Sequence, residues 1–108
     1  MAAMSLRSKK LGLLLSTSPS QPGFQHGLRL AEAAFEEGVD VYLYCVDEAV
    51  RGLDEPRLQS MAGLGLKLYV CAYGAMRRGM DRRPNVTYAG LALLSDVMAA
   101  TDRFVSFN

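Results

Sequence analysis

Short apolar runs alternate with helical segments along almost the whole of this chain of 108 residues. The first run, Leu11–Leu15, lies between two lysines and a loop rich in serine and proline, which is typical of a buried strand. Apolar residues then recur at spacings of four, three and four, which predicts an amphipathic helix. These residues are Phe24, Leu28, Ala31 and Phe35.

The alternation continues to the end of the chain. Four further strands are predicted, over Val39–Val46, Leu66–Cys71, Val86–Tyr88 and Arg103–Phe107. A largely buried helix is predicted over Leu91–Met98, before the last strand. Parallel neighbours need crossover connections, so this order predicts a three-layer α/β/α sandwich around a mostly parallel, five-stranded sheet of flavodoxin-like type. In the usual order for such a sheet, the first strand separates the second strand from the third.

Size and charge set limits on organisation and partners. The chain is long enough for one hydrophobic core, so we expect a single domain over residues 10–108 after a flexible segment over residues 1–9. The net charge of +1 provides no overall attraction to nucleic acid, and direct nucleic-acid binding is not expected. No apolar run approaches the roughly twenty residues of a membrane span, and no secretory signal is evident. We therefore expect a cytoplasmic protein.

Few residues could hold a metal ion or catalyse hydrolysis. Cys45, Cys71 and His26 are far apart in the sequence and do not have the spacing of zinc ligands, so no metal site is expected. The loop after the first strand contains neither of the glycine-rich motifs that bind nucleotides, and no cofactor is expected. The single histidine is expected to face solvent rather than act as a base.

Cys71 is the strongest candidate for chemistry. It is the last residue of a predicted strand and precedes a short predicted helix, where backbone N–H groups lack helical partners. Such a position favours the thiolate, which is the nucleophilic form of cysteine. The alternative is a packed apolar thiol, because free cysteine is among the most buried residue types.

Two segments of the chain resemble a known family. The segment Leu68–Gly79, LYVCAYGAMRRG, has an apolar strand that ends in cysteine and a helix of small residues that ends in Arg-Arg-Gly. This segment and the closing strand Thr101–Phe107 resemble the DsrE/DsrF-like sulfur-relay family, most closely its DsrE/TusD subunit type. The strand and helix over Lys10–Gly38 fit the opening unit of that family.

The resemblance implies a sulfur carrier. Cys71 would take up sulfane sulfur as a persulfide from a donor protein and pass it to an acceptor protein, in tRNA thiolation or in sulfur oxidation. The backbone N–H groups of Ala72 and Tyr73 would stabilise the charged sulfur, and Arg77 and Arg78 would dock the partner. The family also implies a homo-oligomer, either a trimer or a hexamer.

Two questions remain open at this stage. The chain could instead be a non-catalytic oligomeric module that binds a small ligand or a partner protein, with Cys71 merely packed, so its status as a sulfurtransferase enzyme is undecided. Cys45, at the end of the second strand, is expected to be a packed thiol that lies too far from Cys71 for a disulfide.

Overall fold

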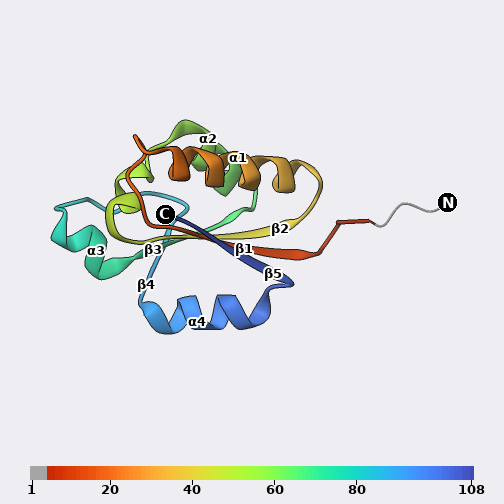
Figure 1. Ribbon diagram of the computed structural model, residues 1–108. Coiled ribbons are helices and arrows are strands. Elements are labelled where there is room, and N and C mark those ends of the chain that lie inside the picture. The colour runs from red at the N-terminus through yellow and green to blue at the C-terminus, as the bar shows by residue number, and fades with distance from the viewer. Residues whose placement is uncertain (1–4) are drawn as a thin grey trace.

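The computed structural model describes residues 5–108, which fold into five strands and their connecting helices (Figure 1). A flexible segment was predicted over residues 1–9, and residues 1–4 of it lie outside the described residues. The elements follow the predicted alternation. In chain order they are β1 (Lys10–Leu15), α1 (Pro22–Glu36), β2 (Asp40–Cys45), η1 (Asp47–Gly52), α2 (Pro56–Gly63), β3 (Lys67–Cys71), α3 (Ala72–Arg77), β4 (Thr87–Ala89), α4 (Leu91–Ala100) and β5 (Arg103–Phe107).

The five strands form one sheet in the order β4-β3-β2-β1-β5, and every neighbouring pair is parallel. The predicted five-stranded parallel sheet is therefore confirmed, but the expected separation of the second and third strands is wrong. β2 and β3 are direct neighbours, with Cys45 opposite Val70. The chain adds strands on one side of β1 as far as β4, and α4 then carries it back to the other edge, where β5 pairs only with β1.

Helices cover both faces of the sheet, as the three-layer prediction required. Figure 1 shows α1 and α2 on one face and α4 on the other, with α3 at the end of the sheet that β3 reaches. Gly27 of α1 permits a close approach to β1, because a Cβ at this position would collide with the side chain of Leu15. This close packing makes the layer between α1 and the sheet the centre of the core.

The two faces of the sheet differ in burial. Side chains alternate between the faces along each strand, and those toward α1 and α2 are apolar and buried. They include Leu13, Leu15, Val41, Leu43, Cys45, Leu68 and Val70. The face toward α4 carries Leu14, Tyr42 and Tyr69, each only half-buried, and Tyr44, which is fully buried. We call these the closed face and the open face.

The fourth helix is not the buried helix that its apolar sequence predicted. Only Val97 is buried in α4, whereas Leu91 is 67% exposed and Met98 is 51% exposed. The helix packs mainly above β1 near the edge of the sheet, and so it leaves much of the open face uncovered. An apolar pattern indicates a surface that avoids water, but it does not say whether the same chain provides the cover.

Within residues 5–108, every helix is too short or too polar to span a lipid bilayer.

Candidate functional site

Cys71 ends β3 and is the N-cap residue of α3. Its side chain points toward the open face and is half-buried. The backbone N–H of Gly74 donates a hydrogen bond to Sγ at 3.3 Å, as a capping side chain does for the first turn of a helix. The sulfur therefore has a fixed direction, remains accessible, and lies against a donor that can support negative charge.

The residues that follow Cys71 differ in how they contact its sulfur. The N–H group that hydrogen bonds to Sγ is that of Gly74, which the sequence interpretation had not singled out. Sulfur stabilisation by the N–H groups of Ala72 and Tyr73 stays a prediction. The Tyr73 side chain is 62% exposed and lies at the edge of the site rather than over the sulfur as a closed lid.

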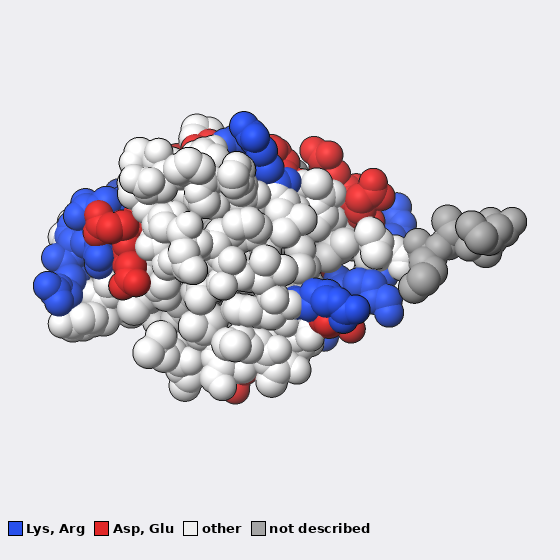
Figure 2. Space-filling view, viewed as in Figure 1, with Lys and Arg blue, Asp and Glu red and all other residues white. Residues whose placement is uncertain are grey.

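A cavity of about 430 Å³ opens beside Cys71. It lies between η1 and α3, two short elements that pack against each other at the end of the sheet. Besides Cys71, Tyr73 and Gly74, its walls are made of charged side chains, and we call it the charged pocket. Those side chains are Asp47, Glu48, Arg51, Arg77 and Arg78. Figure 2 shows basic and acidic groups side by side at this end of the molecule.

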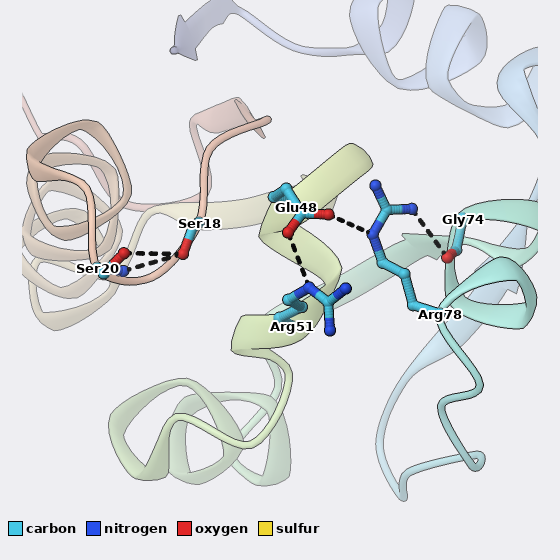
Figure 3. Close-up of polar contacts among 6 residues, drawn as sticks. All are labelled: Ser18, Ser20, Glu48, Arg51, Gly74 and Arg78. Carbon is cyan, nitrogen blue, oxygen red and sulfur yellow. Dashed lines mark hydrogen bonds and ion pairs between the residues drawn. The ribbon is translucent and has the colours of Figure 1, made fainter.

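Glu48 connects two arginines of the charged pocket (Figure 3). Its carboxylate accepts hydrogen bonds from Nε of Arg78 at 2.7 Å and from Nε of Arg51 at 2.8 Å. These contacts, that with Arg78 first, hold the pKa of Glu48 below its usual value. The carboxylate is thus ionised at neutral pH and keeps both guanidinium groups in the wall of the pocket.

Arg78 also lies close to the sulfur. Its Nη1 donates a hydrogen bond to the carbonyl oxygen of Gly74 at 3.1 Å. Nη1 of Arg78 and Sγ of Cys71 are each 3.6 Å from the point that a Cβ on Gly74 would occupy, so the two atoms are at most about 7 Å apart. The guanidinium of Arg78 and the sulfur of Cys71 therefore lie on the same side of Gly74.

The structure separates the two arginines that the sequence had grouped as a docking surface. The side chain of Arg78 is only 19% exposed and is held by Glu48 and Gly74. Arg77 is exposed, with its guanidinium 5.9 Å from the centre of the Tyr73 ring. Docking of a partner by this pair stays a prediction, in which Arg77 is the more accessible member.

Glu48 and Arg51 were missed by the sequence interpretation. Their spacing of three residues is common on helical surfaces, and so it gives no sign of a site. Asp47 is the other acidic group in the wall, and its backbone has a left-handed φ of 50°. Non-glycine residues with positive φ are uncommon and concentrate in turns and functional sites, so this value is the one local signal at the start of η1.

A second cavity, of about 620 Å³ and mostly apolar, borders Cys71 on the side of α4. It shares Asp47, Cys71 and Tyr73 with the charged pocket, and its other lining residues are Val46, Ala72, Ala89, Gly90, Leu91 and Leu94. Tyr44, buried nearby, has its hydroxyl 2.8 Å from the carbonyl oxygen of Gly90. Burial and, to a lesser extent, the charge of Cys71 raise the pKa of Tyr44. Tyr44 is thus a neutral hydroxyl group that fixes the start of α4 beside the site.

Cys45 lies apart from this site even though its strand is adjacent. Because Cys45 is opposite Val70, Cys71 is one position further along β3, and the two thiols point to opposite faces. Cys45 is fully buried in the closed face, and burial raises the pKa of its thiol to about 12. The expectation that the pair forms no disulfide agrees with two free cysteines, but its stated reason, an intervening strand, is wrong.

The fold and the site together define a small α/β protein with an accessible cysteine at the carboxyl end of a strand of a parallel sheet. Residues 9–107 match the model of the DsrE/DsrF-like family, and the chain belongs to that family. The resemblance found in the segment around Cys71 is therefore confirmed over almost the whole chain.

A solved structure supports the fold independently. The YchN protein from E. coli superimposes with a TM-score of 0.80 at 20% sequence identity, over 92% of this chain and 99% of that protein. At this level of identity the likeness establishes a shared architecture. Among curated proteins, none matches the chain in sequence. Within residues 5–108, no three His, Cys, Asp or Glu side chains gather as they would around a metal ion.

Proposed function

We propose that this protein is a sulfur carrier that accepts sulfane sulfur on Cys71 and passes it to a partner protein. Membership of the DsrE/DsrF-like family supports a sulfur-relay type of function. The observation that carries the proposal is the half-buried sulfur of Cys71, which accepts a hydrogen bond from Gly74 and borders the charged pocket. A thiol packed only as a core residue would need neither the open wall nor the nearby guanidinium of Arg78.

The reaction requires no cofactor, because thiolates exchange sulfane sulfur directly. The Cys71 thiolate attacks the outer sulfur of a donor persulfide, a new S–S bond forms, and the donor leaves with the electron pair of the broken bond. Transfer to an acceptor repeats the step in reverse, with the acceptor thiolate attacking the sulfur held on Cys71. The N–H of Gly74 and the cation of Arg78 stabilise the thiolate each time it forms.

The acceptor is a partner protein of a sulfur relay, and such relays serve tRNA thiolation or sulfur oxidation. Arg77, together with the exposed Tyr73 ring beneath it, offers a cation and a flat apolar surface at the edge of the site. An acidic partner that carries its own reactive cysteine would match this surface in charge. Arg78 contributes from within the wall rather than as a free surface group.

The working form is a homo-oligomer, a trimer or a hexamer. The exposed apolar residues of α4, above all Leu91 and Met98, and the half-covered open face beside them support this assignment. Replacement of Leu91 and Met98 by aspartate is expected to lower the mass measured by light scattering to that of one chain. An unchanged mass would place the interface elsewhere or show that the chain is monomeric.

A second candidate function is a non-catalytic module that binds a partner or small ligand. One observation favours it: Sγ of Cys71 caps α3 through the Gly74 N–H, which is a structural role in itself. Serine caps helices at least as well, so a capping role alone would allow Cys71→Ser to retain every function.

Intact-mass measurement tests the two candidates against each other. After exposure to thiosulfate and a thiosulfate sulfurtransferase, which supply sulfane sulfur and release sulfite, the native chain is expected to gain about 32 Da, the mass of one sulfur atom. The gain should disappear in Cys71→Ser and persist in Cys45→Ser, and it should be reversed by an excess of a small thiol. A gain retained in Cys71→Ser, or absent from the native chain, would reject the carrier in favour of the module.

A further inference from the structure

The charged pocket has an excess of positive charge within reach of a nucleophile. Its walls hold three guanidinium groups, from Arg51, Arg77 and Arg78, against the two carboxylates of Asp47 and Glu48. Cys71 lies in the same wall. While Cys71 is a neutral thiol, these side chains give the pocket a net charge of about +1, which favours a monoanion, whereas the two carboxylates oppose a dianion such as phosphate.

The arginines keep hydrogen-bond donors that the described residues do not use. Each guanidinium has five N–H donors in a planar fork, and Glu48 occupies only Nε of Arg51 and Nε of Arg78. Within residues 5–108, the one further side-chain hydrogen bond of these three arginines is from Nη1 of Arg78 to the carbonyl oxygen of Gly74. The outer Nη groups of Arg51 and Arg77 therefore remain able to bind a planar anion.

The size of the cavity limits what can fill it. A volume of about 430 Å³ lies near the lower end of the range for small-molecule sites, which is roughly 300–1,000 Å³. It could hold a molecule the size of a modified amino acid, but not a folded loop of a protein. A carboxylate is the anion that matches a guanidinium fork with two parallel hydrogen bonds.

We propose that the charged pocket binds the carboxylate of a low-molecular-mass persulfide, a cysteine derivative of the form R–S–SH, which serves as the sulfur donor. The proposal rests on the sulfur-carrier function of Cys71 and names the substrate class for its loading step. Arg51 and Arg77 bind the carboxylate, while Glu48 holds Arg51 and Arg78 in place. The partner protein is then needed only to remove the sulfur.

The loading step is balanced without an oxidant or a reductant. The Cys71 thiolate attacks the outer sulfur of R–S–SH, the bond from Sγ to that sulfur forms, and the S–S bond of the donor breaks. The electron pair of the broken bond leaves as R–S⁻, and the proton remains on the transferred sulfur as Cys71–S–SH. One thiolate is consumed and one is released, so the oxidation states are only exchanged between two equivalent sulfurs.

Two matched donors test the role of the carboxylate. The persulfide of N-acetylcysteine carries a carboxylate, and the persulfide of N-acetylcysteine amide differs only in its neutral amide. The native chain is expected to gain sulfur, measured by intact mass over time, about tenfold faster from the acid than from the amide. Arg51→Gln and Arg77→Gln should each remove most of this preference, because they slow the reaction of the acid much more than that of the amide.

Arg82→Gln is the matched control. Arg82 lies over the Tyr88 ring at 4.6 Å, much as Arg77 lies over Tyr73, but it lies outside the charged pocket. The preference should be intact in this variant. Equal rates for the two donors in the native chain, or a preference that survives in both pocket variants, would overturn the proposal.

A binding measurement separates this proposal from the sulfur-carrier function itself. Titration of Cys71→Ser with N-acetylcysteine, followed by NMR, should shift the signals of Gly74 and of the residues of η1, whereas N-acetylcysteine amide should not. Selective binding of the acid without any sulfur uptake by the native chain would retain the anion pocket and reject the carrier. Sulfur uptake without selective binding would retain the carrier and reject the pocket.

Discussion

Each face of the sheet carries one cysteine, and the two cysteines lie in different surroundings. On the closed face, Cys45 is packed among leucine and valine side chains under α1, and none of its surface is exposed. On the open face, Cys71 lies one register position further along the neighbouring strand, where the sheet ends and the charged pocket begins. Burial raises the pKa of Cys45 to about 12, which leaves its thiol neutral at any physiological pH.

The comparison shows that the accessibility of these two cysteines depends on their strand register and on the helices that cover each face, because their strands are neighbours. β2 and β3 are adjacent, yet a shift of one residue exchanges a face covered by two helices for one covered by α4 alone. The closed face supplies most of the apolar burial, and the open face supplies access. Each of the following experiments changes one side of this comparison.

Alkylation of the two thiols should give the largest difference. With iodoacetamide at neutral pH, Cys71 is expected to react in the folded protein. Cys45 is expected to react only in molecules in which the closed face has opened. If that opening approaches global unfolding, the rates differ by at least about a thousandfold. The rates can be measured by peptide mass spectrometry. The control is the unfolded chain in denaturant, in which both thiols should react at similar rates, and comparable rates in the folded protein would contradict the difference in burial.

High pH should destabilise the protein through Cys45. The unfolded thiol ionises near pH 9 and the folded thiol near pH 12, so above pH 9 the unfolded state loses a proton that the folded state retains. The ionisation of Cys45 therefore leaves the free energy of unfolding unchanged below pH 9. Between pH 9 and about pH 12 it lowers that free energy, by about 4 kcal/mol in total.

Denaturant unfolding at pH 7, 9 and 10.5 measures the slope. Cys45→Ala is expected to be less stable at pH 7, because it leaves a small cavity, but to show a shallower decline above pH 9. The raised pKa values of Tyr42, Tyr44 and Tyr69 act in both proteins, so they cancel in the difference between the slopes. Equal slopes for the two proteins would show that Cys45 is not the group responsible.

Truncation of consecutive leucines of β1 compares the two faces directly. Leu13 points into the closed face and is fully buried, whereas Leu14 points into the open face and is half-buried. Leu13→Ala should lower the free energy of unfolding by about 3 kcal/mol and Leu14→Ala by about 1 kcal/mol, measured with denaturant. An equal loss from both variants would mean that a further copy of the chain covers the open face in solution.

The smallest change in the free energy of unfolding should come from the ion pair between Lys67 and Asp40, the first residues of β3 and β2. Nζ of Lys67 lies 2.7 Å from a carboxylate oxygen of Asp40 and 5.0 Å from the centre of the Tyr42 ring. The pair is partly exposed, so Lys67→Gln should lower the free energy of unfolding by about 0.5 kcal/mol. In 1 M salt, where screening is strong, most of this difference should vanish. A difference of 2 kcal/mol or more, unaffected by salt, would mean that the open face is buried.

Local patterns along the chain predicted most of the elements correctly. The helix over Phe24–Phe35 and the strand that ends at Cys71 both have the expected character, because period and terminal residues are encoded within a few positions. The second helix begins at Pro56, because proline is well suited to the first turn. The sequence also singled out Cys71 as the candidate thiol, although its reactivity awaits the experiments above.

The charged pocket was only partly visible in the sequence. Arg77 and Arg78 follow Cys71 closely and were noticed for that reason, but Glu48 and Arg51 come from η1, at least twenty residues before Cys71. They line the same pocket as Cys71 because β2 pairs with β3, which places the segment after β2 against α3. No residue type in η1 indicates this contact, so the sequence pattern predicts that the charged residues of η1 form a solvated helix surface.

The amino-acid sequence by itself determined the succession of strands and helices and the position of Cys71 at a strand end. These depend on periodicity and on terminal residues, which act over short stretches of chain. Tertiary structure alone decided that β2 lies beside β3, that Glu48 and two arginines gather at Cys71, and that α4 leaves the open face half-covered. Those outcomes depend on the packing of segments far apart in the sequence, whose free energy is shared among many side chains and is not carried by any one of them.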